Sequence, residues 1–138
     1  MRALNGYRVY PVTKMGENGV KIGTPKEIFE GEARVAMTPD SALALQKLGH
    51  TCVIETGAGA LAGFSDANYK AAGVEVVKTA AALWKAADVV AKVRAPDAGE
   101  MKRLREGQTL ISFFSPVADE AKMKQAANKG ATVVAMEM

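Results

Sequence analysis

Cysteine and histidine are nearly missing from this chain. Its 138 residues include one cysteine, Cys52, and one histidine, His50. A lone cysteine excludes an internal disulfide, and because no Cys/His cluster surrounds it, the sequence predicts no metal site and favours a reducing compartment. His50 falls in an expected turn, where no Ser or Asp is placed to complete a catalytic triad. We therefore expect His50 to be structural.

Long apolar runs and strong charge are also scarce. No apolar stretch approaches the roughly 18 residues of a membrane-spanning helix, and the first residues lack the apolar core of a signal peptide. The net charge is +3, of which residues 1–20 carry +2 from Arg2, Arg8 and Lys14 against Glu17. The remainder is too weakly basic for a phosphate-binding surface, so we expect no nucleic-acid partner.

The first 19 residues contain no convincing helix or strand, because glycine and proline interrupt every hydrophobic period. They could be a weakly basic presequence, a tag scar or an upstream extension with the natural start at Met15. A transit peptide should be richer in Ser and Arg, which favours the last two. We predict that residues 1–19 are a disordered extension and that residues 20–138 form one domain.

From residue 20 onward, strand-like segments alternate with helix signals. The clearest helix signal is Thr38 as N-cap, with Pro39 at the first helical position and Gly49 at the end. Six strands separated by helices predict a flavodoxin- or Rossmann-like α/β fold, with a mostly parallel sheet and helices on both faces. The expected strands are 21–24, 51–55, 74–77, 89–94, 109–114 and 131–136. The expected helices follow Thr38, Ser65 and Thr79, span about 99–106, and open at Asp119.

A glycine-rich segment follows the second expected strand. Gly57, Gly59 and Gly63 have the spacing G-x-G-x-x-x-G, which is one residue longer than the dinucleotide-binding fingerprint, and no clean helix begins at the third glycine. The pattern favours a tight turn between strand and helix, in which glycine adopts positive φ angles, over a phosphate-binding loop.

Two cations stand at the end of the fourth expected strand. Residues two apart in a strand share a face, so Lys92 and Arg94 are expected together on one face, with apolar residues on the other. Such a pair could hold an anion. Both side chains could equally extend into solvent from the strand end.

Other candidate binding residues also have structural interpretations. Arg34 lies in the loop after the first strand, where ligand contacts are common, but Glu27 or Glu32 could neutralise it. Trp84 and the Phe113-Phe114 pair lie in elements with a buried face, so we expect them in the core rather than as stacking platforms.

The chain stops directly after its last expected strand. Ligands in open α/β sheets bind beyond the carboxyl ends of the strands, so a chain that stops there is expected to lack part of its own site. We therefore predict the front part of a larger, two-domain enzyme subunit.

Five segments carry a resemblance to a known family. They are Lys21-Ile-Gly-Thr-Pro-Lys-Glu27, Glu32-Ala-Arg-Val-Ala-Met-Thr-Pro39, Glu55-Thr-Gly-Ala-Gly59, Lys92-Val-Arg-Ala-Pro96 and Leu110-Ile-Ser-Phe-Phe-Ser-Pro116. Together they resemble the N-terminal domain shared by alanine dehydrogenase and the alpha subunit of proton-translocating NAD(P) transhydrogenase. The resemblance runs in order over about residues 20–138.

Within this family, Ser115 favours the transhydrogenase branch. Alanine dehydrogenases oxidise an amine and need a proton acceptor, and the family places a histidine where this chain has Ser115. A transhydrogenase passes hydride directly from NADH to NADP+, so positioning of the two nicotinamide rings supplies most of the catalysis. The resemblance therefore implies the N-terminal part of an NAD(H)-binding alpha subunit, with no catalytic side chain among these residues.

The family's site residues carry over onto four positions. Arg34 matches the arginine that binds the substrate carboxylate in alanine dehydrogenase. Arg94 matches that enzyme's substrate-binding lysine, and Lys92 matches the lysine two residues before it. Together with Ser115 they are expected to line the cleft near the nicotinamide, although the three cations could instead persist as structural charges.

The resemblance also implies cofactors and partners. It implies NAD(H) in the full subunit, held by a second Rossmann domain, a second alpha subunit in a homodimer, an NADP(H)-binding beta-subunit domain and a membrane proton channel. The complex would lie at the cytoplasmic face of the bacterial inner membrane. We expect this chain alone neither to bind NAD(H) tightly nor to transfer hydride. The alternatives are the N-terminal part of an alanine or saccharopine-type dehydrogenase, and a standalone flavodoxin-like binding module.

Overall fold

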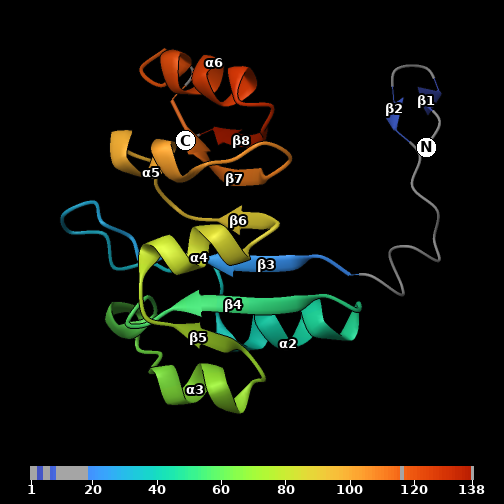
Figure 1. Cartoon of the computed structure of the whole chain (residues 1–138). Coiled ribbons are helices and arrows are strands. Elements are labelled where there is room, and N and C mark those ends of the chain that lie inside the picture. The colour runs from blue at the N-terminus through green and yellow to red at the C-terminus, as the bar shows by residue number, and fades with distance from the viewer. Residues whose placement is uncertain (1–2, 5–6, 9–18, 116, 138) are drawn as a thin grey trace.

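The computed structural model describes residues 3–4, 7–8, 19–115 and 117–137. Within these residues, six strands form one sheet in the order β5-β4-β3-β6-β7-β8, and every neighbouring pair is parallel (Figure 1). The predicted fold class is confirmed. The strands are β3 (Lys21–Thr24), β4 (Thr51–Glu55), β5 (Glu75–Val77), β6 (Val89–Ala91), β7 (Thr109–Phe114) and β8 (Thr132–Glu137).

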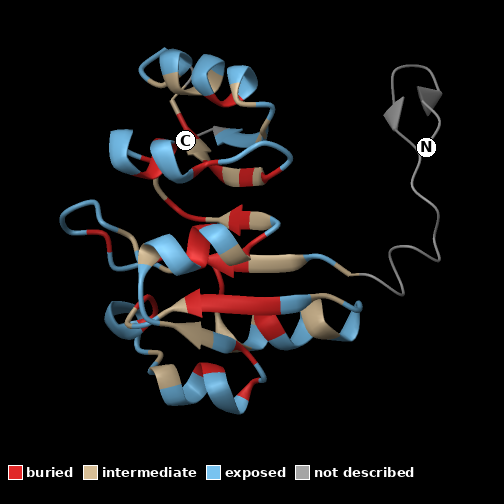
Figure 2. Ribbon diagram, viewed as in Figure 1, coloured by how far each residue is buried: buried red, intermediate tan, exposed pale blue. Residues whose placement is uncertain are grey.

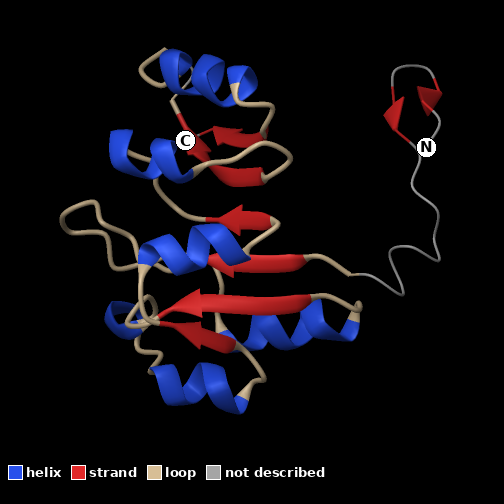
Figure 3. Ribbon diagram, viewed as in Figure 1, coloured by secondary structure: helices blue, strands red, loops and turns tan. Residues whose placement is uncertain are grey.

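Helices connect successive strands, as Figure 3 shows, and most begin at the capping residues that the sequence indicated. The side-chain oxygens of Thr38, Ser65 and Thr79 each accept a hydrogen bond from the backbone N–H three residues later. Asp97, which we did not expect as a cap, caps α5, so that helix begins and ends earlier than predicted. The helices are α2 (Pro39–Lys47), η1 (Ala60–Ala62), α3 (Asp66–Ala71), α4 (Ala80–Ala86), α5 (Ala98–Arg103) and α6 (Glu120–Asn128).

The fourth predicted strand is shorter than expected. β6 ends at Ala91, not at Arg94, and its ladder with β3 stops at the pair Gly23 and Val90. Pro25 follows directly after β3 and has no N–H to donate to a ladder. Because β3 leaves the sheet here, the last predicted residues of β6 lose their neighbour on that side.

Helices cover both faces of the sheet, as predicted. Val53 of β4 belongs to a buried cluster that includes residues of α4, α5 and α6, whereas its neighbours Cys52 and Ile54 belong to a second cluster that includes residues of α2 and α3. Successive strand residues point to opposite faces, so these two clusters lie on opposite sides. Figure 2 shows the buried residues concentrated in the central strands and on the inward faces of the helices.

The aromatic residues divide between core and surface. Trp84 and Phe114 are almost fully buried, which confirms their predicted place in the core. Phe113 is only half-buried and lines a pocket, so the core prediction is wrong for this residue. The reason is the alternation of side chains along β7, which sends Phe113 to the face opposite Phe114.

A short pair of strands lies within the first 19 residues, where we expected no element. β1 (Ala3–Leu4) and β2 (Tyr7–Arg8) pair antiparallel. The sequence between them is Asn-Gly, the dipeptide typical of two-residue hairpin loops, and this signal was missed. The prediction of disorder for the rest of the extension lies outside the described residues.

The glycine-rich segment forms a tight turn, as the spacing favoured. Gly57 and Gly63 have φ angles of 78° and 91°. The N–H of Gly57 donates to the Asp66 carboxylate over 3.0 Å, so this donor already serves an anion from the chain itself. At Gly59 an added Cβ would lie 2.6 Å from the Tyr69 ring. This position therefore needs glycine for close packing.

Candidate functional site at the carboxyl ends of the central strands

The sheet has a topological switch point between β3 and β6. These strands are neighbours, but β3 leads to β4 on one side and β6 leads to β7 on the other. In open α/β sheets, ligands bind in the crevice beyond the carboxyl ends at such a point. In Figure 1 the loop between β3 and α2 projects past this edge of the sheet.

Two adjacent pockets lie at this edge. One, of 270 Å³, is lined by the loop after β3 and by residues from Lys92 to Glu100. The other, of 360 Å³, extends toward the carboxyl end of β7 and includes Phe113, Asp119 and Lys122. Both are lined by Phe29, Arg94, Ala95 and Asp97. We refer to the two pockets together as the carboxyl-edge cleft.

Lys92 lies at the base of the cleft and does not reach solvent. Its side chain is 1% exposed, and its ammonium lies 3.1 Å from Glu27 and 3.5 Å from Glu100. It also donates to the backbone carbonyl of Arg94 over 2.7 Å. Three acceptors thus surround a group with three donors. The interpretation that Lys92 extends into solvent is wrong, because two buried carboxylates hold it inside.

Burial disfavours the charged form of Glu100, the second carboxylate beside Lys92. Burial raises the pKa of its carboxyl above the ordinary value, and the nearby Lys92 ammonium opposes part of that rise. The carboxylate also accepts a hydrogen bond from the backbone of Asp97, as part of the α5 capping box. A charge so placed is held by its partners rather than by water.

Glu32 organises both arginines of the site. Its buried carboxylate accepts from Nε and Nη2 of Arg34, over 2.9 and 2.7 Å, and from Nε of Arg94 over 2.8 Å. The Arg34 guanidinium holds the pKa of Glu32 well below its usual range, and Arg94 adds to this effect. One carboxylate thereby fixes two guanidinium groups side by side.

Arg94 is the cation that the cleft offers to a ligand. Its guanidinium carbon lies 4.2 Å from the centre of the Phe29 ring, a cation–π arrangement, and its side chain is about one-third exposed. Among the described residues, its guanidinium group makes one side-chain hydrogen bond, from Nε to Glu32, and neither Nη group takes part in it. Lys92 and Arg94 therefore separate, one buried and one facing the cleft, and do not act as a pair on one face.

Ser115 lies at the end of β7, beside the cleft. Its N–H donates to the Asp119 carboxylate over 2.7 Å, and the N–H of Asp119 donates to the Ser115 carbonyl over 2.9 Å. These bonds fix the turn into α6. Lys92 and Arg94 line the cleft. Arg34 is linked to it through Glu32, which also binds Arg94, and Ser115 is linked to it through Asp119.

His50 lies at the opposite edge of the sheet. It precedes β4 and its Nδ1 accepts from the N–H of Val20, which precedes β3. The two strands are parallel, so these residues mark their amino ends. The structural interpretation of His50 is confirmed, and the topology keeps the imidazole away from the cleft.

Sequence reasoning missed several cleft residues, above all Phe29, Glu100 and Asp119. Glu27 and Glu32 were noted only as possible neutralisers of Arg34. Their signal was weak, since a carboxylate in a loop is ordinary on any surface. For Glu27 there was one usable signal. It lies three residues after the end of the first strand, and the cations Lys92 and Arg94 stand at the end of the fourth predicted strand, so parallel strands would bring them together.

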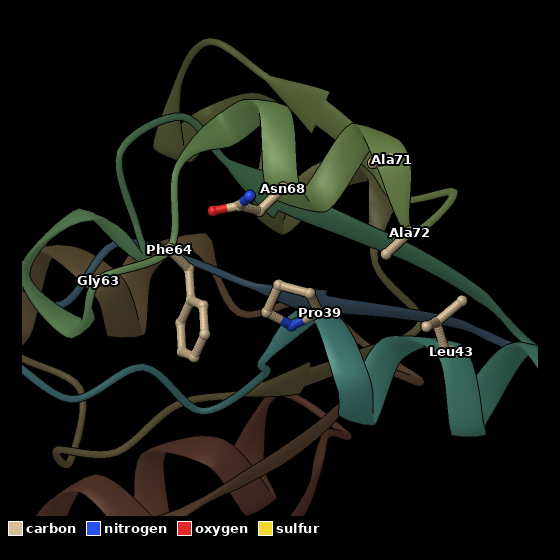
Figure 4. Close-up of a pocket in the computed structure, with 7 residues that line it drawn as sticks. All are labelled: Pro39, Leu43, Gly63, Phe64, Asn68, Ala71 and Ala72. Carbon is tan, nitrogen blue, oxygen red and sulfur yellow. The ribbon is translucent and has the colours of Figure 1, made fainter.

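A further pocket, larger than either part of the carboxyl-edge cleft, lies elsewhere and has no charged side chain in its lining. It has a volume of 510 Å³ and lies between α2 and α3, with Pro39, Leu43, Phe64 and Asn68 around it (Figure 4). Such an open apolar groove lacks the convergent polar groups that orient a small ligand. We therefore place the candidate site at the carboxyl-edge cleft.

No group of three or more His, Cys, Asp or Glu side chains among the described residues could hold a metal ion. None of the helices observed there combines the length and apolar character needed to cross a membrane.

If the strands of this sheet are numbered from 1 to 6 along the chain, beginning with β3, they lie side by side in the order 3-2-1-4-5-6. This order, with a cleft at its switch point, defines a Rossmann-type, doubly wound α/β protein. A family model described as alanine dehydrogenase/PNT, N-terminal domain, matches residues 23–138. The chain belongs to this family.

Individual relatives agree with this assignment. The chain is 68% identical over 119 residues to NAD(P) transhydrogenase subunit alpha from Cereibacter sphaeroides, covering 86% of this chain and 23% of that protein. A solved L-alanine dehydrogenase superposes with a TM-score of 0.79 at 37% identity, covering 83% of this chain and 32% of that chain. Transhydrogenase from Sinorhizobium meliloti superposes with a TM-score of 0.78 at 36% identity, covering 83% and 34%. The chain thus spans about a quarter to a third of these relatives.

Proposed function

We propose that this chain forms the N-terminal lobe of the NAD(H)-binding alpha subunit of a proton-translocating NAD(P) transhydrogenase. The observation that carries the proposal is the position of the sole histidine at the amino edge of the sheet, away from the cleft. Oxidation of an amine needs a proton acceptor, whereas hydride transfer between two nicotinamide rings does not. The 68% identity to a transhydrogenase alpha subunit supports the same choice.

The described residues fit one wall of a cofactor cleft but not a complete dinucleotide site. In this part of the chain the one glycine-rich turn directs the N–H of Gly57 to Asp66, so it offers no cradle for a pyrophosphate. The cleft does offer the rings of Phe29 and Phe113 and the Nη groups of Arg94. A flat ring carrying a carbonyl group suits this combination. The phosphates of NAD(H) would then be bound by another domain of the full subunit.

The four candidate residues take different places in this proposal. Arg94 faces the cofactor, and Arg34, fixed by the same Glu32 carboxylate, stands beside it. Ser115 orders the turn that borders the cleft. Lys92 supports the cleft from below, because its ammonium is enclosed by carboxylates.

The proposal extends to the assembly. The full subunit would dimerise, and its cleft would meet an NADP(H)-binding domain of the beta subunit above a membrane proton channel. The lobe would then lie at the cytoplasmic face of the bacterial inner membrane. The similarity to a transhydrogenase subunit alpha supports these partners.

The test uses the full-length subunit together with its NADP(H)-binding partner. We expect NADH-dependent formation of NADPH, and we expect Arg94→Ala to raise the KM for NADH about tenfold, the order of one lost charge-assisted hydrogen bond. Lys102→Ala, at an exposed position of α5, is the matched control. An assembled complex that forms no NADPH would refute the proposal.

A second candidate function has one observation in its favour. Two guanidinium groups fixed by one carboxylate, as Arg34 and Arg94 are by Glu32, suit the binding of a substrate carboxylate. An alanine dehydrogenase would use them in this way. Oxidation of NADH by the full-length protein with pyruvate and ammonia would select this function, and we expect none, because the sole histidine of this chain lies away from the cleft.

A further inference from the structure

Two backbone N–H groups, those of Val93 and Arg94, lie just past the end of the ladder between β3 and β6. On the β7 side pairing continues past Ala91, because the N–H of Lys92 donates to Ile111 over 3.0 Å and the N–H of Phe113 donates to the carbonyl of Val93 over 3.2 Å. On the β3 side the ladder ends at Val90. Backbone N–H groups that are withdrawn from water need an acceptor, so the N–H groups of residues 93 and 94 require one from outside the ladder.

Glu27 supplies that acceptor. One oxygen of its buried carboxylate accepts from the N–H of Val93 over 2.8 Å, and the other accepts from the N–H of Arg94 over 3.0 Å. In a regular strand, consecutive N–H groups point to opposite sides; here the backbone bends after β6, and one carboxylate accepts from both residues. Its negative charge is balanced by Lys92, 3.1 Å away.

The loop after β3 then holds Arg94 at three points. Glu27 fixes its backbone, Glu32 fixes its Nε, and the Phe29 ring lies against its guanidinium group. We propose that Glu27 is a positioning residue for Arg94, and that Lys92 is the counter-ion of Glu27 and not a ligand-binding group. This inference deepens the proposed function, because it rests on Arg94 facing the cofactor.

The competing interpretation is that Lys92 binds the ligand and Glu27 only neutralises it. The two interpretations predict different effects of replacing Glu27 in a chain that already lacks the Lys92 charge. If Glu27 acts through the backbone, its acceptors matter even after the charge of Lys92 is removed. If Glu27 only neutralises Lys92, removing both charges together leaves nothing for Glu27 to do.

The experiment measures amide hydrogen exchange by NMR in the full 138-residue chain. Glu27→Ala alone would remove the nearer of the two carboxylates that pair with the buried Lys92 ammonium and risks unfolding the chain, so it is combined with Lys92→Met. In Glu27→Ala/Lys92→Met we expect the amides of Val93 and Arg94 to exchange about tenfold faster or more, the order of a lost hydrogen bond to a charged group. The amide of Thr109, which donates to Asp88 at the other end of β7, reports global stability and is expected to change little.

Glu27→Gln/Lys92→Met is the matched control. The amide group that it introduces has one acceptor oxygen, so it can accept from one of the two N–H groups, and we expect protection to return at one of residues 93 and 94 and not at the other. The Nε resonance of Arg94 should move with the first double variant and return with the second. Equal exchange at residues 93 and 94 in both double variants and in Lys92→Met would overturn the inference.

A ligand measurement separates this inference from the proposed function. In the full-length subunit, Glu27→Ala/Lys92→Met should raise the KM for NADH as Arg94→Ala does, with kcat less affected. The variant with Glu27→Gln should recover part of the loss. If Arg94→Ala itself leaves KM unchanged, the proposed function of the cleft fails, while the exchange experiment, which needs no cofactor, still decides the role of Glu27.

Discussion

The two buried carboxylates of Glu27 and Glu32 bind different groups at the cleft. Glu27 serves backbone donors and a buried lysine, whereas Glu32 serves two guanidinium groups that remain partly exposed. A buried carboxylate is stable only where hydrogen bonds and opposite charges replace water. At the residue scale, the site is therefore defined by the groups that pair with its buried carboxylates, and Arg94 is the partly exposed arginine that lines the cleft.

Glu32→Gln should destabilise the chain at neutral pH by roughly 1–2 kcal/mol, because it weakens two charge-assisted hydrogen-bonded contacts. The pKa of Glu32 is lower in the folded chain than its ordinary value of 4.5, so its stabilisation is fully present above that pH and is lost as the pH falls below it. Urea unfolding between pH 3 and pH 7 measures this. Glu30→Gln, an exposed neighbour, is the control, and an unchanged acid-side slope in Glu32→Gln would contradict the prediction.

Glu100→Gln should act in the opposite direction on pH dependence. The pKa of Glu100 is raised by burial, so the folded chain binds this proton more tightly than the unfolded chain. The free energy of unfolding therefore falls as pH rises from about 4.5 through the raised value. Urea unfolding of Glu100→Gln should lack this part of the slope, because the glutamine side chain does not titrate. A slope equal to that of the unmodified chain would argue against a raised pKa of Glu100.

At the scale of elements, the loop between β3 and α2 supplies most of the side chains that hold Arg94 in place. It carries Glu27, Phe29 and Glu32, all of which contact the segment after β6. The sequence indicated the strands and most helices correctly because caps, glycines and apolar periods are local signals. It missed the end of β6 because that end depends on where a different strand, β3, leaves the sheet.

Gly59→Ala should destabilise the packing of η1 against α3. The added Cβ would lie 2.6 Å from the Tyr69 ring and hydroxyl, and that hydroxyl donates to the buried carbonyl of Met37. Overpacking of this kind costs about 1–3 kcal/mol. Thermal unfolding measures the loss. Gly99→Ala is the control, because its Cβ has room within α5 and helix propensity favours alanine by up to about 1 kcal/mol.

At the scale of the whole molecule, the doubly wound sheet brings distant segments to one edge. Glu27 and Arg94 are 67 residues apart in the sequence and meet because β3 and β6 are parallel neighbours. The same topology sends His50 to the other edge. One lobe with a shallow charged cleft is a wall against which a cofactor held elsewhere can be positioned.

The 138-residue chain alone should not bind NADH at micromolar concentrations. The glycine-rich turn is engaged with Asp66, and the cleft contributes one charged wall without a pyrophosphate cradle. Isothermal titration calorimetry checks this prediction, with the full-length subunit as the positive control. A micromolar dissociation constant for the 138-residue chain would show that its own residues complete a nucleotide site.

The sequence by itself determined the alternation of strands and helices, the caps that begin most helices, the turn at Gly57 and the family resemblance. These depend on local periodicity, backbone preferences of single residues and the order of short motifs, all of which are written along the chain. The tertiary structure alone decided that Lys92 is buried, that Arg94 faces the cleft, and that Glu27 accepts from the backbone N–H groups that follow β6. Those outcomes depend on which strand ends lie side by side, because a charge becomes structural or available only when the groups around it are in place.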